Sequence, residues 1–206
     1  MKTVTIKLYN FDELSDDAKE RARDWWRSGD DVFPWAHEFS GSVKAIENAL
    51  DVSFFDISVY SYRPYWYDEN DDNDAENMCF RRAVAYINNR FDFKKIPWTY
   101  PTKRPFVVGR DLPLKPVGVA LAKNVYDDNL LTGYCADYVL HNSYKRFVEY
   151  GRKRPGATLS DFFDMLAHDL QEELQNDYDY MQSNEYIDDI LNDNDYYFTV
   201  DGEFYK

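Results

Sequence analysis

The chain has 206 residues, a formal net charge of -14, and hydrophobic residues at 44% of its positions. That apolar content is too high for an intrinsically disordered chain, and no run approaches the roughly 20 apolar residues of a membrane-spanning helix. The two cysteines, Cys79 and Cys135, are too few for a disulfide framework. We therefore expect a soluble, folded protein of the cytoplasm that makes no contact with a membrane.

The first 50 residues predict a strand followed by two helices. Residues 2–9 alternate between apolar and polar side chains, which is typical of a half-buried strand. Ser15 is placed to cap a helix, and Asp16 and Asp17 then lie near the positive end of its dipole. A second helix with an apolar stripe begins near Pro34.

The centre of the chain is less regular. Residues 52–62 are rich in β-branched and aromatic residues and predict a strand. Residues 68–76 then carry six acids in nine positions. Their spacing resembles a calcium-binding loop, but Asn73 stands where glycine is needed and Cys79 where glutamate is needed, so we expect a solvated loop. The periodicity of residues 77–91 allows a helix or part of a hairpin.

Residues 94–154 carry an excess of positive charge, with 12 bases against five acids. Five prolines exclude a long helix from residues 94–123, which we expect to form an irregular insertion. In residues 94–110, bases alternate with aromatic residues. This pattern suits a groove for single-stranded nucleic acid, but also a loop that packs on the domain and balances its acids. Residues 117–123 and 130–140 predict strands.

Residues 155–195 predict an acidic, helical portion. Thr158 and Asp161 form a capping signature before an apolar run. Asp201 and Gly202, between alternating apolar residues, predict a terminal hairpin. Apolar residues at spacings of three and four predict one face of a long helix and then a shorter helix: Phe163, Leu166, Leu170, Leu174, Tyr178 and Met181, followed by Ile187, Ile190 and Leu191.

The negative charge is concentrated in the same portion of the chain. Residues 155–205 contain 14 Asp and Glu and neither Lys nor Arg, whereas residues 1–154 hold 24 acids against 23 bases. Such a surface is either the solvated face of an acidic protein or a rod of negative charge offered to a basic partner. The candidate partner-binding residues, expected to form a continuous exposed ridge, are Asp169, Glu172, Glu173, Asp177, Asp179, Asp188 and Asp189.

Together these elements predict an α+β fold in a single domain over residues 1–206. We expect an antiparallel sheet made of residues 2–9, 52–62, 130–140 and the terminal hairpin. Two N-terminal helices and the long acidic C-terminal helix should cover this sheet, because elements with one apolar face pack in layers.

The sequence contains none of the common catalytic or cofactor-binding motifs. There is no glycine-rich nucleotide loop, no HExxH, no paired CxxC and no GxSxG. The three histidines, His37, His141 and His168, stand far apart in the sequence. We therefore expect a protein that is not an enzyme, with no catalytic residues, no metal site and no cofactor.

Both ends of the chain resemble a widespread family of small acidic proteins encoded by phages. The similar segments are residues 9–27, which contain FDELSDDAKERAR, residues 131–140, and residues 166–204, which end in FTVDGEF. Members of that family begin with a strand and a helix and end with a helix, a short helix and a hairpin, and some carry antitoxin-like labels. The centre departs from the family, since the acidic run of residues 68–76 replaces a Gly-Asp-Gly loop.

The resemblance implies an origin in a phage and therefore activity in the cytoplasm of the host bacterium. Phages encode small acidic proteins that occupy the nucleic-acid channels of host defence complexes. We expect a DNA-mimic-like inhibitor of anti-CRISPR or anti-restriction type, which binds a host protein with a basic nucleic-acid-binding surface and does not bind nucleic acid itself. One alternative is an antitoxin-like protein that neutralises a basic toxin or nuclease. Another is an enzyme or single-strand binder that uses residues 94–110.

The charge predicts that free DNA does not bind at physiological salt, because a protein of net charge -14 repels a polyanion. Gel-shift titrations with single- and double-stranded DNA measure this directly. Binding below micromolar concentration would instead favour the single-strand binder.

Overall fold

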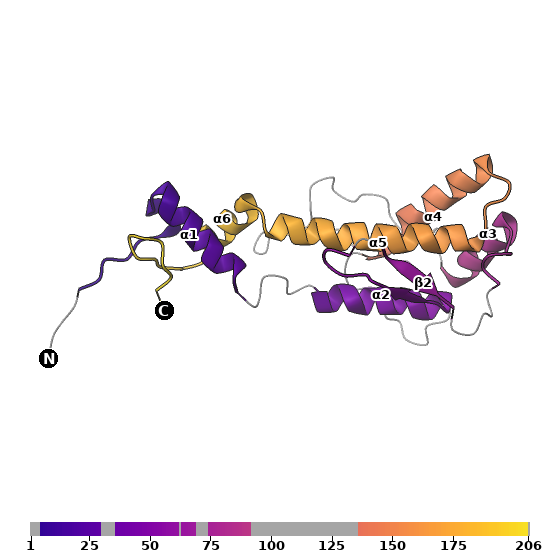
Figure 1. Ribbon diagram of the computed structural model, residues 1–206, viewed down its shortest axis with the longest axis horizontal. Helices are drawn as coiled ribbons and strands as arrows, with labels where there is room; N and C mark the ends of the chain where they lie inside the picture. The colour runs from indigo at the N-terminus through magenta and orange to yellow at the C-terminus, as the bar shows by residue number, and fades with distance from the viewer. Residues whose placement is uncertain (1–4, 30–35, 62, 69–73, 92–135, 206) are drawn as a thin grey trace. The chain divides into compact units, whose positions relative to one another are not determined.

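The computed structural model describes residues 5–29, 36–61, 63–68, 74–91 and 136–205 (Figure 1). The chain divides into two compact units: Met1–Ala36 with Gln175–Lys206, and His37–Leu174. We call them the terminal unit and the central unit. The single domain expected over residues 1–206 stays a prediction, and the proposed insertion at residues 94–123 lies outside the described residues.

The terminal unit is built from short helices at both ends of the chain. These are η1 (Phe11–Glu13), α1 (Asp16–Arg27) and α6 (Asn184–Asp193). The predicted cap of α1 is confirmed, since the Ser15 hydroxyl accepts a hydrogen bond from the Ala18 N–H at 3.4 Å. The buried core of the unit comprises Phe11, Leu14, Ala18, Ala22, Met181, Tyr186, Ile187, Leu191 and Phe198.

The terminal hairpin closes this core. Phe198 pairs with Phe204 and also with Tyr9, whose N–H and C=O each bond the Phe198 backbone at 2.9 Å. Of the strand expected over residues 2–9, the described residues 5–9 form only this bridge at Tyr9. The chain cannot continue the ladder, because Asn10 immediately caps η1, with its N–H donating to the Glu13 carboxylate at 2.9 Å.

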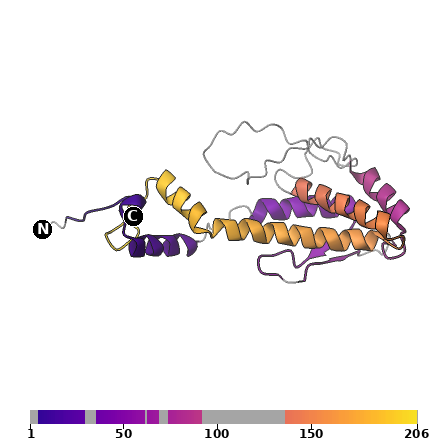
Figure 2. The same cartoon turned by 90° about the horizontal axis from the view of Figure 1, so that it is seen from above.

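The central unit contains the sheet. Strands β1 (Ser53–Phe55) and β2 (Tyr65–Tyr67) pair antiparallel, with Phe54 opposite Trp66. Helices α2 (Ala36–Leu50), α4 (Ala136–Lys153) and the first part of α5 (Leu159–Met181) lie side by side in this unit, and α3 (Phe80–Arg90) lies near the start of α5 (Figures 1 and 2). The α+β class predicted from the sequence is confirmed, but the sheet is smaller than expected.

One predicted strand is shorter than expected and another is wrong, each for an identifiable reason. The strand expected over residues 52–62 ends at Phe55, because Asp56 and Tyr60 adopt positive φ angles of 58° and 68° that no strand accommodates. Residues 136–140 of the strand expected over 130–140 instead begin α4, and the remainder lies outside the described residues. A longer window shows the helical period, since Ala136, Val139, Leu140, Ser143 and Phe147 are all buried.

The helices expected at the C-terminal end are confirmed as α5 and α6. The backbone N–H of Thr158 donates to the Asp161 carboxylate at 2.7 Å, as the capping signature predicted. The segment 77–91, for which the sequence allowed a helix or part of a hairpin, contains α3 over Phe80–Arg90, with Ala83 and Ile87 fully buried. The expected apolar stripe of α5 is buried at every position except Tyr178, which is half-buried.

We predict that Gly202→Ala lowers the free energy of unfolding of the terminal unit by about 2 kcal/mol. Gly202 has a φ of +82°, and a Cβ there would lie 2.1 Å from the backbone oxygen of Ala18. Urea denaturation followed by tryptophan fluorescence measures the change. Gly156→Ala is the matched control, because a Cβ at that exposed glycine meets nothing within 4 Å. Equal effects of the two substitutions would contradict the prediction.

Candidate functional site

The carboxylates of α5 and α6 differ in their exposure. On α5, the exposed residues follow one another at spacings of three and four, namely Asp164, His168, Glu172, Asn176 and Asp179. This spacing places them in one solvent-facing stripe. Three acids are thus spread over about 22 Å of helix, or one per about 11 Å, whereas one strand of B-DNA carries a phosphate every ~3.4 Å.

Two of the seven candidate residues are held in internal ion pairs. The Asp169 side chain is only 12% exposed, pairs with Arg146, and accepts a hydrogen bond from the Ser143 hydroxyl at 2.6 Å. Asp188 receives two hydrogen bonds from the Arg23 guanidinium, at 2.6 and 2.7 Å. These hydrogen bonds raise the pKa of Arg23 against the opposing effect of its burial. Both carboxylates are therefore neutralised by arginines of the same chain, and these ion pairs stabilise the fold.

The other five candidates keep more contact with solvent. Glu172, Asp179 and Asp189 are exposed, whereas Glu173 and Asp177 are half-buried. Asp179 accepts a hydrogen bond from the Gln175 amide at 2.8 Å. The expectation of a continuous exposed ridge is thus wrong, because the carboxylates nearest the buried stripe turn toward arginines of neighbouring helices. What remains is a set of separated exposed carboxylates.

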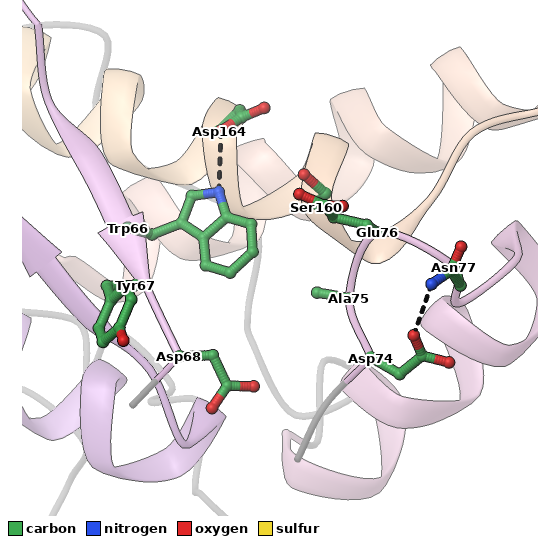
Figure 3. Close-up of a pocket in the computed structure, with 9 residues that line it drawn as sticks. All are labelled: Trp66, Tyr67, Asp68, Asp74, Ala75, Glu76, Asn77, Ser160 and Asp164. Carbon is green, nitrogen blue, oxygen red and sulfur yellow. Dashed lines mark hydrogen bonds between the residues drawn. The ribbon is translucent and has the colours of Figure 1, made fainter. Parts of the chain in front are cut away.

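A cleft of about 510 Å³ opens at the start of α5 in the central unit (Figure 3). The Trp66 indole forms one wall, and its Nε1 donates to the Asp164 carboxylate at 2.8 Å. Across the cleft, the Asn77 amide donates to Asp74 at 2.8 Å. The lining residues come from β2, the turn before α3 and the start of α5: Trp66, Tyr67, Asp68, Asp74, Ala75, Glu76, Asn77, Ser160 and Asp164.

This cleft combines carboxylates with aromatic rings. Asp68, Asp74, Glu76 and Asp164 are acidic, and the described lining contains neither Lys nor Arg. A concave surface of this kind concentrates negative potential and attracts cations. The sequence indicated the acidic run of residues 68–76 but gave no signal that joined it to Trp66 and Asp164.

Among the described residues, the side chains that could bind a metal do not form a cluster. In the described parts of the chain, no group of three or more His, Cys, Asp or Glu side chains could hold a metal ion. His141 is buried in α4, and burial, followed by the charge of Lys145, lowers its pKa to about 4. This histidine is therefore neutral at physiological pH.

Comparisons with known proteins give no independent assignment. No protein-family model, curated protein or solved structure matches the chain. Within the described residues, no helix is both long enough and apolar enough to cross a membrane.

We predict that neutralising Asp188 and its neighbour Asp189 has different consequences. Asp188→Asn weakens the paired contact with Arg23 and should lower the free energy of unfolding by about 1–3 kcal/mol. Asp189→Asn at the adjacent exposed position should change it by about 0.5 kcal/mol or less. Thermal and urea denaturation of the two variants checks this. If both variants were as stable as the wild type, Asp188 would have no structural role.

Proposed function

We propose that the protein is a phage-encoded, non-enzymatic inhibitor that binds a host nucleic-acid-handling defence complex of anti-CRISPR or anti-restriction type. Its partner is a host protein whose basic surface normally holds nucleic acid. The observation that carries the proposal is the exposure of Glu172, Asp179 and Asp189 on helices whose portion of the chain lacks basic residues. Among the described residues, neither Glu172 nor Asp189 makes an ion pair.

A large net negative charge lowers the stability of the free protein through self-repulsion. A basic partner reduces the net charge of the complex and is attracted to the exposed carboxylates. The effect is largest on the rate of association, because long-range attraction steers the encounter of two oppositely charged surfaces. The spacing of these charges is too wide to reproduce a regular phosphate backbone, so they support binding to scattered Lys and Arg side chains.

The test begins with capture of the partner complex from the host bacterium by the full-length chain. The association rate is then measured for the wild type and for the triple variant Glu172→Gln, Asp179→Asn, Asp189→Asn. We expect the variant to associate at least about tenfold more slowly at low salt, and the wild type to lose this advantage as salt screens the charges. The variant should remain folded, because all three positions are exposed.

The control variant, Asp193→Asn, Asp195→Asn, neutralises two other exposed acids, at the last residue of α6 and just after it. Acids of α1 suit this purpose less well, because Asp16 and Asp17 lie in its first turn and Asp24 pairs with Arg27. This double variant tests whether any loss of negative charge slows association. An affinity indifferent both to the triple neutralisation and to ionic strength would show that the acids are only a solvated face.

A further inference from the structure

The outward face of the β1–β2 hairpin is an exposed aromatic surface. Side chains alternate between the two faces of a strand, and Phe54 and Trp66 point inward, with the Trp66 ring 4.9 Å from Phe163. Phe55, Tyr65 and Tyr67 therefore share the opposite face, and they are 39%, 51% and 55% exposed. We call these three side chains the aromatic face.

Two of the three rings of the aromatic face stack on each other. Phe55 and Tyr65 are cross-strand partners, and their rings stack with centroids 5.1 Å apart and an interplanar angle of 14°. Such a pair would bury a large apolar area if another molecule covered it, and adjacent exposed aromatic residues are unusual on a surface without a binding partner. Both residues nevertheless remain exposed to solvent.

Three exposed carboxylates lie beside the aromatic face, and one exposed base, Arg63, precedes Tyr65 by two residues. Asp56 follows Phe55 directly and is exposed. Tyr67 also lines the acidic cleft, together with Glu76 and Asp164 (Figure 3). An occupant must therefore bring positive charge to the border as well as a flat group to the rings.

We propose that the aromatic face and the adjoining cleft are a docking surface for an arginine-rich segment of a partner protein. The guanidinium group of arginine is planar, stacks on aromatic rings and pairs with carboxylates, so one side chain can satisfy both parts of the surface. Lysine can pair with the carboxylates but does not stack in this way. The surface is distinct from the exposed carboxylates of the proposed inhibitor function, so the proposal does not rest on that function.

Two other occupants fit the surface less well. Single-stranded nucleic acid can stack its bases on aromatic rings, but the bordering carboxylates repel its phosphates. A second copy of this chain would bring a second set of the same carboxylates to the interface.

The proposal is tested with the full-length chain and synthetic peptides of nine arginines or nine lysines, by calorimetric titration at low and physiological salt. We expect the arginine peptide to bind the wild type about fivefold more tightly than the lysine peptide. The variant Tyr65→Thr, Tyr67→Thr keeps residues that favour strands, and should lose that preference. The matched control is Tyr197→Thr, Tyr205→Thr, which removes two tyrosines that are each 46% exposed in the terminal unit.

Glu76→Gln is the charge variant, and it should weaken both peptides while keeping the preference for arginine. If the double tyrosine variant does not fold, as judged by circular dichroism, Tyr67→Thr alone replaces it and should reduce the preference. Equal binding of the two peptides by the wild type would overturn the proposal. So would an equal loss in the control variant, tighter binding of oligo-dT than of the arginine peptide, or a dimer in sedimentation that only the Tyr65 and Tyr67 substitutions dissociate.

The peptide titration tests the docking surface independently of the experiment that tests the proposed function. Loss of the arginine preference in the Tyr65 and Tyr67 variant supports the docking surface, whatever the triple carboxylate variant does to the host complex. An unchanged preference overturns the docking surface and leaves the inhibitor function to its own test.

Discussion

Burial of the apolar stripe of α5 is the constraint on which the rest of the structure depends. Leu159, Phe162, Phe163, Leu166 and Leu170 are fully buried in the central unit, and Met181 at the end of the same helix belongs to the core of the terminal unit. A broad buried stripe takes up much of the circumference of a helix, so few positions remain exposed for charged side chains. Carboxylates beside the stripe must find partners, while those opposite it remain in solvent.

Because some carboxylates are paired within the fold and others are exposed, the net charge of -14 does not show how much negative charge is available to a partner. Removing water from a carboxylate costs free energy unless a cation or hydrogen-bond donor replaces it. Asp169 meets this requirement through Arg146 and Ser143, and Asp188 through Arg23. Glu172 and Asp189 need no such replacement, because water still reaches them. Local burial therefore decides which acids stabilise the fold and which are available for binding.

The sequence predicted best those features that depend on neighbouring residues. The cap at Ser15, the signature at Thr158 and Asp161, and the periods of α5 and α6 each lie within a short window. The Asp201–Gly202 turn is likewise local, and Gly202 has the positive φ that such turns require. Local rules were sufficient for these elements, because the side chains that stabilise each cap, helix or turn lie within the element itself or next to it in the sequence.

Features that join distant residues could not be predicted in this way. Arg23 and Asp188 are separated by 165 positions, and Trp66 and Asp164 by 98. The seven candidate carboxylates were therefore placed on a helix correctly, but the arginines that neutralise two of them could not be assigned. The small extent of the sheet was missed because strands of three residues carry too little alternation to be distinguished from loops.

The loop between β1 and β2 shows how α5 also fixes the aromatic face. Asp56 and Tyr60 in this loop hold positive φ angles, a conformation that persists only where surrounding contacts impose it. Gln171 of α5 supplies such contacts, because its buried amide accepts from the Ser58 N–H at 2.9 Å and donates to the Ser58 C=O at 2.7 Å. On the inner side of the sheet, Phe163 supports Trp66. The strands are thus held on a rigid helix, and a ligand that covers Phe55 and Tyr65 loses less of its binding free energy to ordering the surface than it would on a free hairpin.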